Sequence, residues 1–351
     1  MATLYEKVYG CLAASRVGSA MGAAVEGWSP ERIEETYGFV DQFYSYLHYG
    51  DRGVDWQRMP GTTEDGIERQ KLMCRAIIAK QDRITAQDLA KEVAEATDLS
   101  KAWYMTQPED LRIIEFMKAG VPAVEVGRVS GWNGLNFARA TQPIGLINAG
   151  DPEGAVRDVM DIGRLFFPPT DSALVWSGVY DAAIAEALKP DATINSVIAT
   201  SREYATDRMK AEIDRTVDLA ASLDSKEMRN EFYKYYNGTG IPYAMCYANE
   251  TVCKALAIFV NVGGDAKQAI LDGVNFGRDT DCLAASAGGL AGAFSGIGAV
   301  PQEWVDQLDK ATTANPYTNT ICTVKEHADG VHAALKNRAQ KMRELASLLE
   351  S

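Results

Sequence analysis

Apolar residues recur every three or four positions through several long stretches of the chain, with polar residues between them. The pattern is clear at 184–189, 211–220, 252–259 and 333–340. This spacing places the apolar side chains on one face of an α-helix. The sequence has no run of alternating β-branched residues, and no Asn-Gly or Asp-Gly turn links two such runs. The pattern therefore predicts a mainly helical protein.

Two segments near opposite ends of the chain share a texture of small residues. Residues 12–27 and 283–298 both begin Leu-Ala-Ala-Ser and continue with glycine at short intervals. Small side chains let helix backbones approach closely, so these segments suit two central helices of one core. We therefore expect a single domain over 1–351 whose ends come together. The stretches 37–56 and 127–150 are expected to be irregular surface segments, which in helical domains are often binding loops.

Composition and charge exclude several classes of partner. The net charge of −13 argues against a nucleic acid, because binding phosphates requires a local excess of Lys and Arg. The six cysteines form no CxxC pair, which indicates reduced thiols in a cytoplasmic protein. The N-terminus lacks the pattern of a signal peptide. The uncharged segment 282–302 is rich in Gly, Ala and Ser, which favours a buried helix over a membrane span.

Two acidic steps stand where helices are predicted to begin. One runs Asp279-Thr-Asp281 and the other Thr62-Thr-Glu-Asp65, more than 200 residues upstream. Taken singly, each step has a structural explanation, because acids and Thr cap helix N-termini and Thr62 and Asp65 have capping-box spacing. The other explanation is a metal site, since neighbouring carboxylates repel unless a cation lies between them. If the fold joins the steps, four carboxylates and several hydroxyls suit Mg²⁺, Ca²⁺ or Mn²⁺.

Other catalytic patterns are weak. The histidines are His48, His327 and His332, and none has helical ligand spacing with another, which disfavours zinc. A G-x-S-x-G nucleophile elbow is missing from the sequence. Gly18 to Gly22 lacks the lysine of a P-loop, so its glycines are interpreted as packing positions.

An acid and several aromatic residues are further candidates. Glu26 ends an otherwise apolar helix, so it is either a surface acid or a carboxylate aimed at the same centre. Trp28, Tyr243 and Tyr247 either stack on a base or sugar ring or pack in the core and its rim.

Three parts of the chain resemble the ADP-ribosylglycohydrolase family of the dinitrogenase-reductase-activating type. They are residues 10–28, the Thr-Glu-Asp of 63–65, and the Asp-Thr-Asp with its Gly/Ala-rich helix in 275–293. Their order and spacing match the family from about residue 4 to residue 304. Residues 131–145 resemble its Gly-Asn-Gly loop with altered spacing.

The resemblance implies an all-α, compact orthogonal helical bundle with a metal cleft at helix N-termini. In this family two Mg²⁺ ions hold the ribose hydroxyls and a water, and one or two Mg²⁺ (or Mn²⁺) ions are expected here. By position, the metal ligands are Thr63, Glu64, Asp65, Asp279 and Asp281. The candidate catalytic residues are Glu26, Asp65 and Asp279, with Glu26 as general base. The candidate substrate-binding residues are Asn133 and Gly134, through backbone N–H groups, with Trp28 and Tyr243.

Three departures from the family pattern fall at the chemistry. Glu64 replaces an Asp, Cys282 replaces the last Thr, and Ser19 stands where the family usually has Asp. A thiol is a poor ligand for Mg²⁺, so one metal position is well supported and the second is open. We therefore expect a metal-dependent hydrolase that cleaves a glycosidic bond at the anomeric carbon of a small or protein-linked ribosyl substrate such as ADP-ribose. The alternatives are a small-nucleoside N-ribohydrolase and a catalytically weak ADP-ribose-binding or structural relative. The sequence does not specify the oligomeric state.

Overall fold

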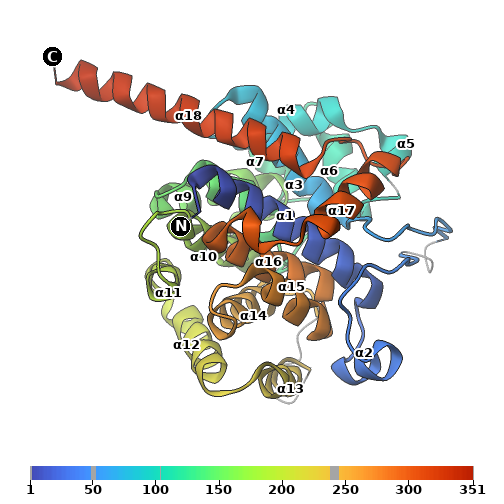
Figure 1. Ribbon diagram of the computed structural model, residues 1–351. Coiled ribbons are helices and arrows are strands. Elements are labelled where there is room, and N and C mark those ends of the chain that lie inside the picture. The colour runs from blue at the N-terminus through green and yellow to red at the C-terminus, as the bar shows by residue number, and fades with distance from the viewer. Residues whose placement is uncertain (1, 49–52, 103, 238–244, 351) are drawn as a thin grey trace.

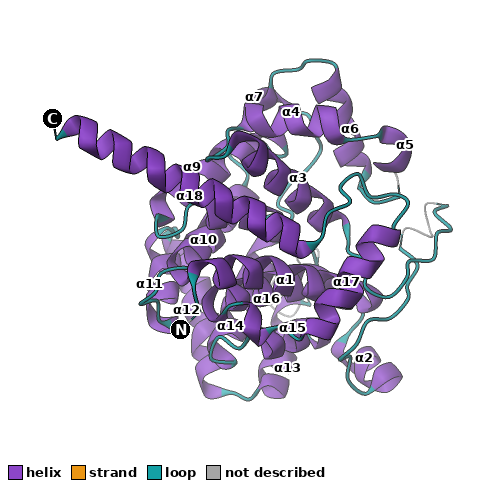
Figure 2. Cartoon of the chain, turned by 45° about the horizontal axis from the view of Figure 1, so that its top comes forward, coloured by secondary structure: helices purple, strands orange, loops and turns teal. Residues whose placement is uncertain are grey.

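The computed structural model describes residues 2–48, 53–102, 104–237 and 245–350. Figure 2 shows helices and loops, and no strand, among these residues. The helices are α1 (Leu4–Gly22), α2 (Pro30–Tyr37), α3 (Asp65–Lys80), α4 (Ala86–Ala96), α5 (Leu99–Ala102), α6 (Pro108–Lys118), α7 (Ala123–Val126), α8 (Ala138–Ile147), α9 (Pro152–Ile162), α10 (Ser172–Ala187), α11 (Ile194–Glu203), α12 (Asp207–Ser222), α13 (Ser225–Tyr236), α14 (Ala248–Asn261), α15 (Ala266–Asn275), α16 (Thr280–Ser295), α17 (Gln302–Ala314) and α18 (Val324–Leu349), with 3-10 turns η1 (Ala23–Val25), η3 (Gly163–Leu165) and η4 (Ile297–Ala299). The expected all-α class is confirmed.

Helices α1 and α16 lie side by side at the centre of the molecule (Figure 1). A Cβ atom on Gly18 would stand 2.3 Å from the main-chain oxygen of Ala284, and one on Gly22 would stand 2.5 Å from that of Thr280. Only a residue without a side chain permits so close an approach. The two helices are buried along most of their length. The close pairing predicted from the two Leu-Ala-Ala-Ser segments is therefore confirmed.

Other helices surround this pair. Helices α14 and α15 pack on α16, α18 packs on α1 and α3, and α8 lies between α3 and α10. The helices predicted from apolar spacing appear as α10, α12, α14 and α18. The far end of α18 extends beyond the body of the molecule (Figure 1), with Leu345, Leu348 and Leu349 exposed. None of the described helices is both long and apolar enough to span a membrane.

The second predicted irregular stretch, 127–150, was only partly correct. Residues 138–147 form α8, which is buried along its whole length and contains Pro143. Proline leaves the carbonyl four residues earlier without its helical N–H donor. That carbonyl belongs to Arg139, and the side-chain amide of Gln70 donates to it at 3.0 Å. Tertiary packing thus satisfies the group that Pro143 frees, and the helix continues through a residue that usually ends one.

Candidate functional site

A polar cleft lies at the N-termini of α3 and α16. Its volume is about 470 Å³, and the two acidic steps meet in it. It also contains the acid that follows η1. The predicted residues that line it are Glu26, Glu64, Asp65, Asp279 and Asp281, and Cys282 lies beside them.

Helix capping does not account for the acidic steps. Glu64 is the N-cap residue of α3 and Asp279 that of α16, yet neither side chain accepts a capping hydrogen bond from the backbone of its helix. Besides its ion pairs, the carboxylate of Asp65 accepts, within the described part of the chain, only the N–H of the next residue, Gly66, at 2.6 Å. The acids of both steps therefore lie at helix N-termini, where the dipole favours negative charge, with their side chains directed to other partners.

A pair of backbone hydrogen bonds holds Glu26 next to Asp279. The N–H of Gly27 donates to the carbonyl of Arg278 at 2.7 Å, and the N–H of Arg278 donates to the carbonyl of Trp28 at 2.8 Å. Arg278 has a φ of 66°, a left-handed conformation that costs a non-glycine residue roughly 1–2 kcal/mol. Its guanidinium is held by the carboxylate of Glu250 at 2.7 and 2.9 Å. This buried pair fixes the turn that aims Asp279 at the cleft.

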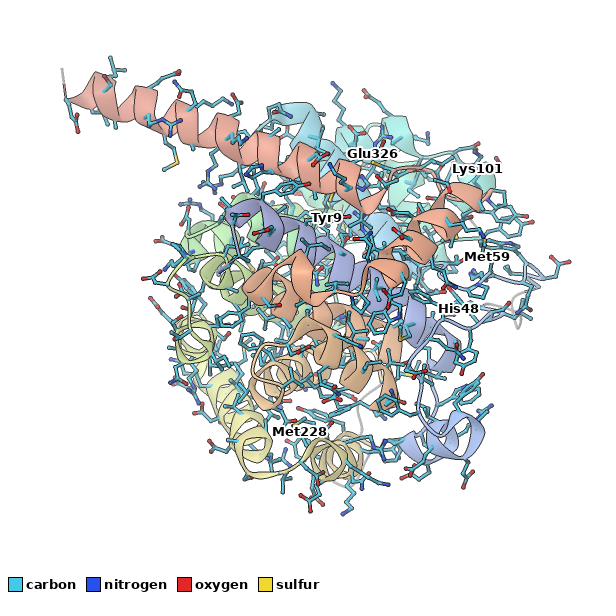
Figure 3. All side chains as sticks on the ribbon, viewed as in Figure 1. Tyr9, His48, Met59, Lys101, Met228 and Glu326 are labelled. Atoms are coloured by element: carbon cyan, nitrogen blue, oxygen red, sulfur yellow. The ribbon has the colours of Figure 1, made fainter. Side chains whose placement is uncertain are left out.

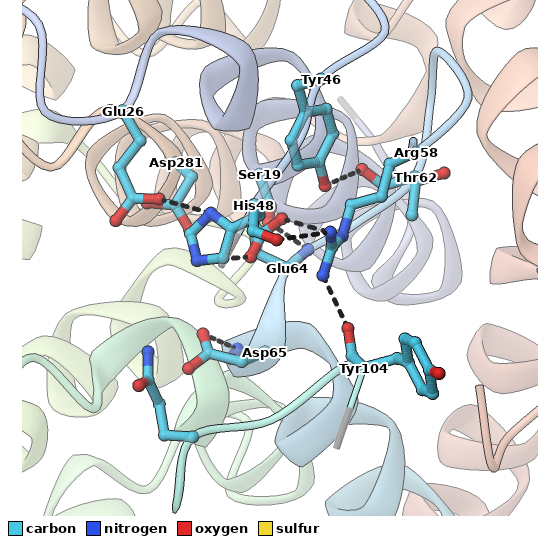
Figure 4. Close-up of polar contacts among 12 residues, drawn as sticks. Ser19, Glu26, Tyr46, His48, Arg58, Thr62, Glu64, Asp65, Tyr104 and Asp281 are labelled. Carbon is cyan, nitrogen blue, oxygen red and sulfur yellow. Dashed lines mark hydrogen bonds and ion pairs between the residues drawn. The ribbon is translucent and has the colours of Figure 1, made fainter. Parts of the chain in front are cut away.

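His48 connects the acids from two segments. It lies on the loop between α2 and α3 (Figure 3). Its Nδ1 is 3.3 Å from Glu26 and its Nε2 is 3.5 Å from Glu64, as Figure 4 shows. Arg58 approaches Glu64 from the other side at 3.8 Å. The sequence pattern does not predict this position of His48, which was weighed only as a zinc ligand, because a long loop gives no spacing from which to place the residue.

Two arginines balance the negative charge of the acids at the other end of the cleft. Arg139, on α8, pairs with Asp65 at 2.5 Å and with Asp281. Arg69 pairs with Asp65 at 2.9 Å and with Asp110 at 2.6 Å. The sequence analysis assigned neither arginine a role. The i,i+4 spacing of Asp65 and Arg69 was the one signal present in the sequence for the second of them.

The pKa shifts divide the cleft into two regions. Burial favours the neutral form of Asp65, but Arg69 and Arg139 outweigh it and hold the pKa of this carboxyl below its usual range. Burial raises the pKa of Asp279 to about 6, although Arg139 opposes the shift. Burial, with Asp279 and Glu64 nearby, raises the pKa of Glu26 well above its usual range. The cleft is therefore short of positive charge around Glu26 and Asp279, and well supplied around Asp65.

The donor atoms around Asp279 fit a hard cation. Asp279 Oδ2 and Asp281 Oδ1 are buried and meet no hydrogen-bond donor in the described part of the chain. Ligand atoms of Asp279, Asp281 and Cys282 all lie within 4.8 Å of one another. Burial raises the pKa of the Cys282 thiol well above its usual range, so the sulfur stays protonated and is a poor ligand. Two carboxylates with free oxygens match the preferences of Mg²⁺ or Mn²⁺.

The remaining predicted residues lie outside this cleft lining. Thr63 is buried beside Glu64. Asn133 and Gly134 line a separate cavity of about 460 Å³, and the Gly134 N–H already donates to Asp171 at 3.0 Å. The ring of Trp28 stacks on Tyr37 at 5.9 Å between centroids, under the guanidinium of Arg32. Tyr243 falls outside the described residues. The roles assigned to these residues stay predictions.

Comparison with known proteins identifies the family. A family model described as ADP-ribosylglycohydrolase matches residues 1–339. The chain belongs to this family. A solved structure titled "ADP-ribosylglycohydrolase-related protein complex" superposes with a TM-score of 0.65 at 18% identity, and covers 95% of this chain and 98% of that one. The fold is thus that of an ADP-ribosylglycohydrolase, as the resemblance implied.

Several relatives match over most of their length. The ADP-ribosyl-[dinitrogen reductase] glycohydrolase of Rhodospirillum rubrum is 23% identical over 316 residues, which is 88% of this chain and 92% of the relative. The uncharacterized protein YegU of Escherichia coli is 21% identical over 344 residues, covering 93% of this chain and 99% of YegU. An uncharacterized protein of Archaeoglobus fulgidus is 23% identical over 314 residues, covering 86% and 92%.

The structure shows the surroundings of two residues that depart from the family pattern, Ser19 and Cys282. The hydroxyl of Ser19 accepts the N–H of Glu64 at 3.4 Å, so this position supports the acidic step through its backbone. Cys282 lies in the first turn of α16 beside the free oxygens of Asp279 and Asp281.

Proposed function

We propose that this ADP-ribosylglycohydrolase family member is a divalent-metal-dependent hydrolase, and that it cleaves a glycosidic bond at the anomeric carbon of an ADP-ribosyl or related ribosyl substrate. The observation that carries the proposal is the meeting of six carboxylates in one cleft, five of them from the Glu26 segment and the two acidic steps, which are far apart in the sequence. Burying so much negative charge costs free energy unless a cation joins it. Family membership supports the ribosyl substrate.

Asp279 and Asp281 are the residues that would hold the ion, because their carboxylates keep buried oxygens without a donor. A bound Mg²⁺ or Mn²⁺ supplies a Lewis acid that orients ribose hydroxyls and eases deprotonation of water. The main-chain bonds between 27–28 and Arg278 hold these carboxylates against the Glu26 segment. The site is thus preorganised by the fold.

Glu26 is the general base in this proposal. Burial and the neighbouring Asp279 and Glu64 raise its pKa, and a higher pKa makes a carboxylate a stronger proton acceptor. Glu26 accepts a proton from the attacking water, whose oxygen forms the new bond to the anomeric carbon. The bond from that carbon to the leaving nitrogen or oxygen breaks, and the leaving group takes up a proton. His48, 3.3 Å from Glu26, fixes the direction of the carboxylate.

The size and surroundings of the cleft agree with a ribosyl group and part of its substituents. A volume of about 470 Å³ lies within the roughly 300–1,000 Å³ usual for small-molecule sites. Its acidic lining is unsuited to bare phosphates without a cation. We therefore place the sugar of the substrate beside the carboxylates and the rest of the substrate toward the opening of the cleft.

The test compares two substrate classes, each with and without a free divalent ion. Sugar release is measured from an ADP-ribosylated protein and from simple nucleosides, each with Mg²⁺ and with EDTA. Metal-dependent release from the ADP-ribosylated protein supports the proposal, and preference for nucleosides would instead identify a nucleoside hydrolase. Thermal stabilisation by ADP-ribose without turnover of either substrate would identify a binding protein.

A further inference from the structure

The guanidinium of Arg139 lies directly between the two acidic steps. Its Nη2 donates to Asp65 at 2.5 Å, and its Nη1 donates to Asp281. These two carboxylates come from α3 and α16, and the sequence pattern assigned both to metal ions. Arg139 itself is 5% exposed. A fixed positive charge therefore occupies a position between carboxylates from the two halves of the site.

The surrounding chain is shaped to hold this arginine. A Cβ atom at Gly66, in the first turn of α3, would stand 1.9 Å from Arg139 Nε and 2.6 Å from its Cζ. Glycine in a helix costs about 1 kcal/mol relative to alanine, and here its missing side chain gives the guanidinium its path. The carbonyl of Arg139 is anchored by Gln70 at 3.0 Å, at the point where Pro143 interrupts the helical bonding. Two independent features thus fix the position of Arg139.

The carboxylate oxygens of the cleft differ in whether they already accept hydrogen bonds. Both oxygens of Asp65 are engaged, Oδ1 by Gly66 N–H and Arg139 and Oδ2 by Arg69 at 2.9 Å. In contrast, Asp279 Oδ2 and Asp281 Oδ1 are buried without a donor in the described residues. An ion at Asp65 would have to displace an arginine, whereas an ion at Asp279 and Asp281 would meet free lone pairs.

We infer that Arg139 takes the place of one of the two cations of a two-metal site, so that the cleft binds a single divalent ion at Asp279 and Asp281. This inference rests on the metal part of the proposed function. It also gives Arg139 a positioning role, because the guanidinium joins α3 to α16 before any ion binds. A guanidinium suits this role, since its planar set of N–H donors can bond to two carboxylates at once.

The number of bound ions tests the inference without an activity assay. Mn²⁺ is titrated into metal-free protein, and bound ions per chain are counted by electron paramagnetic resonance and by calorimetry. We expect one Mn²⁺ in the wild type and two in Arg139→Met, which leaves Asp65 Oδ1 with the Gly66 N–H alone and removes the arginine from Asp281 Oδ2. The control is Arg83→Met, which removes a guanidinium from its pair with Asp158 away from the cleft and should leave one ion.

A second variant guards against misfolding of the first. Gly66→Ala keeps every charge but places a methyl group on the path of the arginine side chain, so it should also raise the count from one to two. Two ions in the wild type, or one in both variants, would overturn the role of Arg139 and leave the proposed function standing. No ion in the wild type would contradict the single-ion site and the proposed metal dependence together. If both variants then gained one ion, the substitution of a cation by Arg139 would still hold.

Discussion

Replacing the buried carboxylate of Asp181 should stabilise the protein at neutral pH. Asp181 lies on α10 with no exposed surface, and among the described residues neither of its side-chain oxygens has a hydrogen-bond donor at bonding distance. The nearby hydroxyl of Thr141 bonds at 3.2 Å to the main-chain oxygen of Ala138. Burial raises the pKa of Asp181 well above its usual range. Asp181 lies where α10 contacts α8, the helix that carries Arg139. A Cβ atom added at Gly145 of α8 would stand 3.1 Å from the main-chain oxygen of Asp181.

The sign of the effect follows from proton binding. The unfolded carboxyl loses its proton near the ordinary aspartate pKa of 3.8, while the folded one keeps it to higher pH. Above that pH the unfolded state is therefore favoured by about 1.4 kcal/mol per pH unit, until the folded group also ionises. By pH 7 the cost reaches at most about 4 kcal/mol. Asn has the shape of the protonated acid and no proton to lose, so Asp181→Asn should be more stable than wild type at pH 7, by at most about 4 kcal/mol, and almost unchanged at pH 4.

Urea unfolding followed by circular dichroism measures the difference. The midpoint and slope are compared for wild type and Asp181→Asn at pH 4 and pH 7. Asp218→Asn, at an exposed position, is the control and should change neither midpoint. An equal change at both pH values, or destabilisation at pH 7, would refute a proton-linked cost at Asp181.

Two further predictions address the base and the central helix pair. Glu26→Gln should lower kcat by about 10²–10⁴-fold with Mn²⁺ affinity nearly unchanged, because it removes proton acceptance but keeps the shape, and undiminished turnover would exclude Glu26 as the base. Gly18→Ala should destabilise the fold by about 1–3 kcal/mol or more in urea, because the new methyl group would meet the backbone of α16 at 2.3 Å. Gly298→Ala is its control, since nothing lies within 4 Å of a Cβ there, and equal stability of the two variants would contradict the close packing of α1 and α16.

The sequence predicted the parts of this structure that depend on local pattern. Apolar spacing located the long helices, and the small residues of 12–27 and 283–298 predicted the α1–α16 pair, because steric access depends directly on side-chain size. The order of the motifs, through the family resemblance, predicted that the two acidic steps share one cleft, and residues of both steps line it.

The parts that depend on long-range contacts were missed. Pro143 and its neighbouring glycines indicated a loop, since the amide of Gln70 that rescues the Arg139 carbonyl lies on another helix. Arg139 and His48 therefore had no assigned place, although both contact the acids of the cleft. The bond from the Gly134 N–H to Asp171 is a further long-range contact that no spacing reveals, and the substrate-binding role of Gly134 stays a prediction.

The release of free ADP-ribose from an ADP-ribosylated protein tests the central claim most directly. Release is followed with Mg²⁺, after EDTA, and after Mg²⁺ is restored, for the wild type and for Asp279→Asn. We expect release that stops with EDTA, returns with Mg²⁺ and is lost in the variant, because Asp279 supplies a free buried oxygen to the ion. Release that EDTA leaves unchanged, or that Asp279→Asn retains in full, would contradict a metal-dependent site at this cleft.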